Sequence, residues 1–169
     1  MIALFFLLAQ SLANAHVVYQ VWQKGAQARA ELWLTPERAH LKAPDREVFW
    51  DLVKERRLDL SGGRSRDEPI SFSRILQADE LFPRGLSLTR GGRRRLLGRT
   101  CQVFTHQQDV PTGESNVKSR FTWCIWRGVP LSLDYARSVC RGRACKRSGA
   151  TFRATELSLG GVKEGDVRR

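Results

Sequence analysis

The sequence predicts an all-β protein with at most one or two short helices. From His16 onward, apolar and polar side chains alternate with the period of two that is typical of strands, and clusters of turn residues interrupt the pattern. Only residues 75–82 have a helical pattern, which Pro83 ends within about two turns. Some strands have large apolar groups on both faces, such as Phe49 next to Trp50, which indicates that the second face is covered as well.

The start of the chain has the pattern of a signal peptide, which we assign to residues 1–15. Residues 1–9 are entirely apolar, and Ala13-Asn14-Ala15 is a small-x-small cleavage motif. A membrane anchor is a weaker alternative because the apolar run is far below the roughly 20 residues that a spanning helix needs, and a buried first strand is another. We expect cleavage near Ala15 and a periplasmic or secreted protein with no transmembrane segment.

One β domain is predicted over residues 16–159, followed by a flexible tail at residues 160–169. Turn residues such as Lys24-Gly25 and Gly62-Gly63 separate the strands because glycine accepts positive φ. Gly91-Gly92 is predicted as a further turn. Outside a central hairpin, the predicted strands are residues 17–22, 30–34, 39–43, 47–53, 57–60, 70–73, 131–139 and 151–159.

The central hairpin is predicted over residues 98–130. Counted inward from Cys101 and Cys124, its two arms meet at Thr112-Gly113. This register places the two cysteines opposite each other and His106 across from Ser119.

Four cysteines in an exported chain indicate two disulfides and allow three connectivities. The hairpin register favours Cys101 with Cys124. Cys140 then pairs with Cys145 across a two-residue loop in which Gly142 can take positive φ. A zinc site is the weaker alternative because the chain has no CxxC motif and three histidines.

The chain is strongly basic, with a formal net charge of +12 and 23 arginines against 6 lysines. Genomic composition bias is one explanation, and attraction to an anionic envelope surface is the other. Nucleic acid is a poor partner for an exported chain. Two clusters are denser than a uniform bias predicts, although charge runs beside turns are more often solvated loops. As a candidate anion-attracting rim we assign Arg93, Arg94, Arg95, Arg141 and Arg143.

Two motifs in the hairpin resemble a known pattern. Gly98-Arg99-Thr100-Cys101-Gln102-Val103 and Cys124-Ile125-Trp126-Arg127-Gly128-Val129-Pro130-Leu131 are similar to motifs of the LolA/LolB-like periplasmic half-barrel superfamily, in a domain-of-unknown-function branch. The resemblance implies a curved antiparallel sheet that is open on one side. It also implies a relation to proteins that carry lipid-modified proteins through the periplasm.

A covered second face has two explanations. The protein covers it with its own loop or by curling of the sheet, or an apolar ligand lies in the concavity. For the second case, the candidate ligand-binding residues on the apolar face are Trp33, Phe49, Trp50, Phe104, Phe121, Trp123 and Trp126.

Catalytic patterns are weak throughout. The chain has no Gly-x-Ser-x-Gly elbow, and its cysteines are expected to be oxidised. Cleavage after Ala15 would leave His16 at the N-terminus, where it could chelate copper together with His106 or His40, as in histidine-brace enzymes. An N-terminal histidine is also an ordinary result of cleavage. We therefore expect no catalytic residues, no cofactor and no enzymatic activity.

Two functions remain as hypotheses. The first is a monomeric binding or carrier protein that holds an apolar or amphiphilic ligand, such as a lipid or a lipoprotein acyl chain, against a curved sheet. The second is a structural or interaction protein of the cell envelope whose core is filled by its own side chains.

Overall fold

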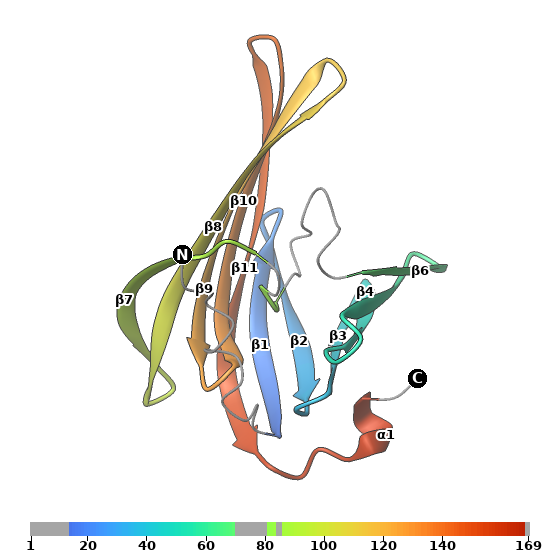
Figure 1. Ribbon diagram of the computed structural model, residues 1–169, viewed down its shortest axis with the longest axis vertical. Helices are drawn as coiled ribbons and strands as arrows, with labels where there is room; N and C mark the ends of the chain where they lie inside the picture. Colours follow the sequence, from blue (N-terminus) through green and yellow to red (C-terminus); the bar gives the residue numbers. More distant parts are fainter. Residues whose placement is uncertain (1–13, 70–80, 84–85, 168–169) are drawn as a thin grey trace.

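The computed structural model describes residues 14–69, 81–83 and 86–167, which form one curved antiparallel sheet and a short helix (Figure 1). The predicted strand 70–73 and residues 75–80 of the predicted helix lie outside the described residues. The elements are β1 (Ala15–Gln23), β2 (Ala26–Leu34), β3 (Arg38–Ala43), β4 (Arg46–Asp51), β5 (Arg56–Ser61), β6 (Arg64–Pro69), β7 (Thr89–Leu96), β8 (Arg99–Thr112), β9 (Ser115–Trp126), β10 (Val129–Arg141), β11 (Ala144–Leu159) and α1 (Glu164–Val167).

The eleven strands form an open half-barrel. Their order is β6-β5-β4-β3-β2-β1-β11-β10-β9-β8-β7, so two meanders are joined where β1 pairs with β11. The sheet does not close, and β6 and β7 are its edges. The predicted class, a curved antiparallel sheet in an open half-barrel, is therefore confirmed.

The Gly91-Gly92 turn was predicted wrongly, because both glycines lie inside β7. The reversal occurs later, at Leu97-Gly98, where both residues have positive φ. Gly91 lies close to β8, since a Cβ there would be 3.3 Å from Cγ1 of Val103. The pairing shifts register between Arg90 and Arg93, as at a β-bulge.

The predicted hairpin register is wrong by two residues. Thr112 pairs with Ser115, so the loop is Gly113-Glu114, and His106 lies across from Phe121 rather than Ser119. The pair that closes a two-residue loop exchanges main-chain hydrogen bonds in both directions. The predicted loop would have given this position to Pro111, which has no N–H to donate.

Both predicted disulfides are present despite the shifted register. Cys101 bonds Cys124 with a Cα–Cα distance of 5.4 Å, although the direct cross-strand partner of Cys124 is Val103. The first bridge is therefore diagonal. Cys140 and Cys145 are directly opposite each other, and Gly142 has the positive φ that the prediction required.

The core lies on the face of the sheet that we call the inner face, defined by Val17, Tyr19, Leu32 and Leu41. These side chains are fully buried and are aligned across neighbouring strands, as the pairing of Val17 with Leu32 and of Leu32 with Leu41 shows. The opposite face, which contains His16 and Trp33, is the outer face.

The strands β8 to β11 extend past the end of β1 and β2 as a projecting arm (Figure 1). We define the arm as residues 107–120 and 136–149. These residues lie beyond the point where β1 ends, at the pair formed by Gln23 and Ala150. The arm has strand neighbours only within itself among the described residues.

A flexible tail was expected at residues 160–169, but part of this segment is ordered in α1. The His40 side chain donates from Nδ1 to the carbonyl oxygen of Asp166 at 2.8 Å, and Val167 is buried. Packing against β3 and β2 therefore offsets the ordering of a four-residue helix, which is too short to be stable alone.

The two disulfides should differ in their contribution to stability. In the chain-entropy model the ring closed by Cys101 and Cys124 contributes about 3.4 kcal/mol, and the small ring closed by Cys140 and Cys145 about 2.2 kcal/mol. We expect C101A/C124A to lower the free energy of unfolding more than C140A/C145A, as measured by urea titration without reductant. Equal losses would contradict this ranking.

Tyr19 should make the fold sensitive to alkali. Its hydroxyl donates to the Pro130 carbonyl at 2.5 Å, and complete burial raises the pKa of Tyr19 above its usual value. The unfolded chain loses this proton above about pH 10 while the folded chain keeps it, so stability falls as pH rises from there. We expect Y19F to cost about 1–3 kcal/mol at pH 7 because the Pro130 carbonyl loses its donor. The variant should lose less stability than the parent between pH 9 and pH 11, and parallel urea-titration curves would contradict this.

Candidate functional site

The inner face is the most extensive apolar surface of the molecule. One row runs through Val21, Phe152, Leu133, Trp123 and Phe104, from β1 across β11, β10 and β9 to β8. All five side chains are buried. The inner face is therefore continuous across the junction between the two meanders.

The structure divides the predicted ligand-binding residues between the two faces. Trp50, Phe104, Phe121 and Trp123 are buried on the inner face. The remaining three, Trp33, Phe49 and Trp126, alternate with inner residues and are half-buried on the outer face.

Side chains from outside the sheet pack on the inner face. Among the described residues, the segment between β6 and β7 contributes four side chains to the apolar core: Leu81, Phe82, Leu86 and Leu88. Phe82 packs edge-on against Trp50, with ring centroids 5.2 Å apart. His106 donates from Nδ1 to the Ser87 carbonyl at 2.9 Å, which fixes the end of this segment on β8.

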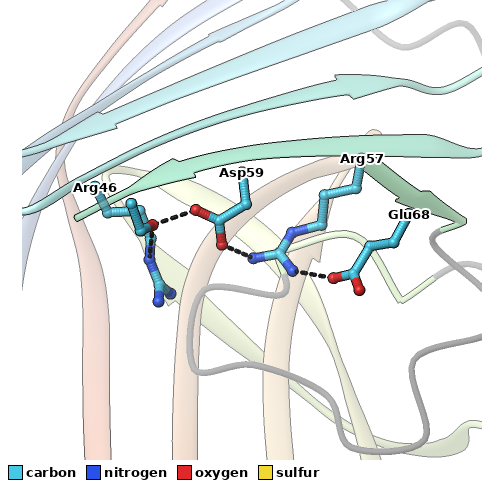
Figure 2. A network of polar contacts seen from close by, with 5 residues as sticks. Arg46, Arg57, Asp59 and Glu68 are labelled. Atoms are coloured by element: carbon cyan, nitrogen blue, oxygen red, sulfur yellow. Dashed lines mark hydrogen bonds and ion pairs between the residues drawn. The ribbon is translucent and has the colours of Figure 1, made fainter. Parts of the chain in front are cut away.

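At the β6 edge the inner face becomes ionic (Figure 2). Arg57 lies across from Trp50 and is 1% exposed. Its guanidinium donates to Asp59 at 3.3 Å and to Glu68 at 3.0 Å. Ser61 donates to Asp59 and accepts from Arg46, which extends the chain of contacts to β4.

The sequence pattern did not reveal this network. The alternation in Leu58-Asp59-Leu60 predicts that the leucines face the core, whereas the structure turns Arg57 and Asp59 inward. The pairing with β4 decides the matter, because Trp50 on the inner face lies opposite Arg57 while Phe49 on the outer face lies opposite Leu58. When the neighbouring strand has apolar side chains on both faces, the alternation of a strand does not by itself show which of its side chains face the core.

The outer face has a stacked row of rings over four strands. His16, Trp33, His40 and Phe49 are cross-strand neighbours, with successive ring centroids 5.0, 5.2 and 4.1 Å apart. Nε2 of His16 lies 2.9 Å from Glu31, and Nε2 of His40 lies 2.8 Å from Glu47. These histidines are held in a packed structural row.

The structure does not assemble the copper site considered from the sequence. His16 on β1 and His106 on β8 are four strand positions apart, about 19 Å at ~4.8 Å per strand, and face opposite sides. Trp33 separates His16 from His40. Within the described ranges, no three His, Cys, Asp or Glu residues are grouped as metal ligands would be.

The predicted arginine rim is not one surface. Arg93, Arg94 and Arg95 are exposed on the edge strand β7, whereas Arg141 and Arg143 are at the tip of the arm. Arg93 pairs with Gln102, and Arg141 is level with Thr112, ten residues or about 33 Å further along β8. Arg141 is moreover paired with Glu114.

Comparison with known proteins gives weak similarity. No family model matches the chain, and no curated protein matches its sequence. Among solved structures, the crystal structure of MucB aligns with a TM-score of 0.43 and 16% identity over 98% of this chain and 61% of that chain. The MucA/MucB complex of Pseudomonas aeruginosa aligns with a TM-score of 0.41 and 16% identity over 96% and 58%. The chain thus spans about three fifths of these neighbours.

The described part of the chain contains no helix long and apolar enough to cross a membrane.

Arg57 should be essential for the β5–β6 edge. R57A leaves Asp59 and Glu68 close together without their cation, and we expect a loss of about 3–5 kcal/mol in the free energy of unfolding. Arg56, its neighbour in the same strand, pairs with Asp67 at 2.8 Å at the surface, so R56A should cost less than about 1 kcal/mol. Urea titration of both variants tests this, and equal losses would show that the buried network does not stabilise the edge.

Proposed function

We propose that this chain is an exported binding protein of the cell envelope, periplasmic or secreted after cleavage near Ala15. Its half-barrel holds an apolar or amphiphilic ligand, such as a lipid or a lipoprotein acyl chain, on the inner face. The role is one of binding rather than catalysis, and the protein acts as a monomer. The LolA-like hairpin motifs support the same class of function.

One observation supports this proposal above the others. Domains usually bury an apolar sheet face under a complete second layer. Here the inner face extends from Trp50 on β4 to Phe104 on β8, and among the described residues it is packed from outside the sheet by Leu81, Phe82, Leu86 and Leu88. These four side chains come from a connecting segment rather than from a second sheet, and such a segment can be displaced by a ligand at smaller cost.

A second function is favoured by the open edges. β7 is an exposed edge strand with main-chain groups directed away from β8, and it contains Arg90, Arg93, Arg94 and Arg95. None of these arginines forms an ion pair with another described residue. An acidic extended segment of an envelope protein could add to this edge as a further strand.

The position of the tryptophans provides a direct test of the first function. A fatty acid brominated on its acyl chain quenches tryptophans that it touches, and we expect it to quench the inner pair Trp50 and Trp123. Quenching should therefore weaken in W50F and W123F. It should persist in the matched outer-face variants W33F and W22F.

Equal quenching in all four variants would place the ligand elsewhere on the surface. An absence of quenching in the parent protein, with recovery of one envelope partner at equimolar yield on an immobilised sample, would favour the interaction function instead.

A further inference from the structure

The first row of cross-strand neighbours on the inner face of the arm is polar, and two of its side chains have a buried polar atom without a hydrogen-bond partner among the described residues. Its members, from β8 to β11, are Gln108, Ser119, Arg137 and Ser148. Ser119 is 4% exposed, yet its Oγ has no hydrogen-bond partner among the described residues. Nε of Arg137 is likewise buried and lacks a partner there. Because an unpaired buried polar atom is destabilising, both groups call for a hydrogen-bond partner from outside the described residues.

Arg137 differs from Arg57, another arginine on the inner face. Arg57 is neutralised by Asp59 and Glu68. Arg137 forms no ion pair with any described carboxylate, and its direct neighbours across the strands are the two neutral residues Ser119 and Ser148. A half-buried guanidinium without a carboxylate, beside a buried hydroxyl, is suited to a small anion such as a phosphate or carboxylate group.

The row also lies at a chemical boundary. On the side toward the body of the sheet, the next inner row contains Phe121 and Tyr135, whose ring centroids are 4.8 Å apart, and it leads to Trp123. Arg137 and Ser119 therefore stand where the aromatic part of the inner face ends and the arm begins, and the next row along the arm contains Val110, Val117 and Val139. An amphiphile placed along this surface would have its charged end at Arg137 and its apolar chain over the aromatic residues.

The surroundings add positive charge. A groove of about 510 Å³ on the arm is lined by Gln108, Ser119 and Arg137 and, for the larger part, by residues of the outer face, which include Lys118, Arg120 and Arg147. Asp109 is the acidic lining residue, and it already pairs with Lys118 at 3.4 Å. Because alternate residues face opposite sides, Arg120 is exposed on the outer face next to Ser119, and its charge acts at longer range.

We propose that Arg137 and Ser119 bind the anionic headgroup of an amphiphile whose acyl chain lies on the inner face. This rests on the proposed binding function and specifies its ligand class as a single-chain lipid with a phosphate or carboxylate head. The guanidinium donates to the anion, and the Ser119 hydroxyl supplies a further donor directly across the strand pair.

The test compares three probes on the parent protein and on R137Q by isothermal titration calorimetry below the critical micelle concentration. The probes are lysophosphatidic acid, a monoacylglycerol with the same chain, and inorganic phosphate. We expect R137Q to bind lysophosphatidic acid about ten-fold more weakly, because one charge-assisted hydrogen-bonding group is lost. Its affinity for the monoacylglycerol should be unchanged. R137K should bind lysophosphatidic acid with intermediate affinity, because it keeps the charge but not the forked donor.

R153Q is the matched control, because it removes the same charge from an exposed outer-face residue of β11 that does not line the groove. Its affinity for lysophosphatidic acid should equal that of the parent protein. Equal weakening in R153Q and R137Q would overturn the assignment, because a general basic field would then explain the attraction. Unchanged affinity of R137Q would overturn it as well.

The other two probes separate the remaining outcomes. Binding of inorganic phosphate as tightly as lysophosphatidic acid, with the same loss in R137Q, would overturn the amphiphile and leave a site for free anions. If the monoacylglycerol binds and lysophosphatidic acid binds R137Q as tightly as the parent protein, this inference is contradicted but the proposed function is not. Failure of both lipids to bind would contradict the proposed function as well. A thermal melt of R137Q that matches the parent shows that any loss is not due to unfolding.

Discussion

The inner face of an unclosed sheet has to be removed from water, and the rest of this structure depends on how that is done. Burial of apolar area contributes about 25 cal/mol per Å², so a face that contains Tyr19, Trp50 and Trp123 is a large part of the driving force for folding. A closed barrel would fill its interior from all sides. Here the curvature of a single sheet contributes, and among the described residues Leu81, Phe82, Leu86 and Leu88 pack on the same core from outside the sheet.

An arginine borders the aromatic part of the inner face at each of two places, and the surroundings of the two arginines differ. At the β6 edge, Arg57 is enclosed by Asp59 and Glu68, so its charge is compensated within the fold. At the base of the arm, Arg137 stands beside Ser119 and Ser148 without a carboxylate from the described residues. Folding stability explains the first arrangement. The second arrangement is the one for which we propose recognition of an anion.

Much of the fold could be predicted because alternation and turn chemistry are local signals. Strands such as β1 to β5 and both disulfides follow from them. The predictions that failed depend on residues of a neighbouring strand or on main-chain hydrogen bonding. The missing N–H of Pro111 set the hairpin register, and Trp50 on β4 decided that Arg57 faces inward. Edge strands β6 and β7 are mostly exposed and so lack an apolar period. Arg137 was hidden because a polar residue in a strand gives no sign of whether its charge is compensated.

The exposed edge strand β7 also affects how copies of this chain meet. Four of its eight residues are arginine, so an antiparallel pairing of β7 with its own copy would bring like charges into register. A free edge of this kind normally invites aggregation, but repulsion between identical strands acts against it here. The same charges that leave the main chain open to an acidic segment therefore help to keep a concentrated solution of the protein from forming edge-to-edge assemblies.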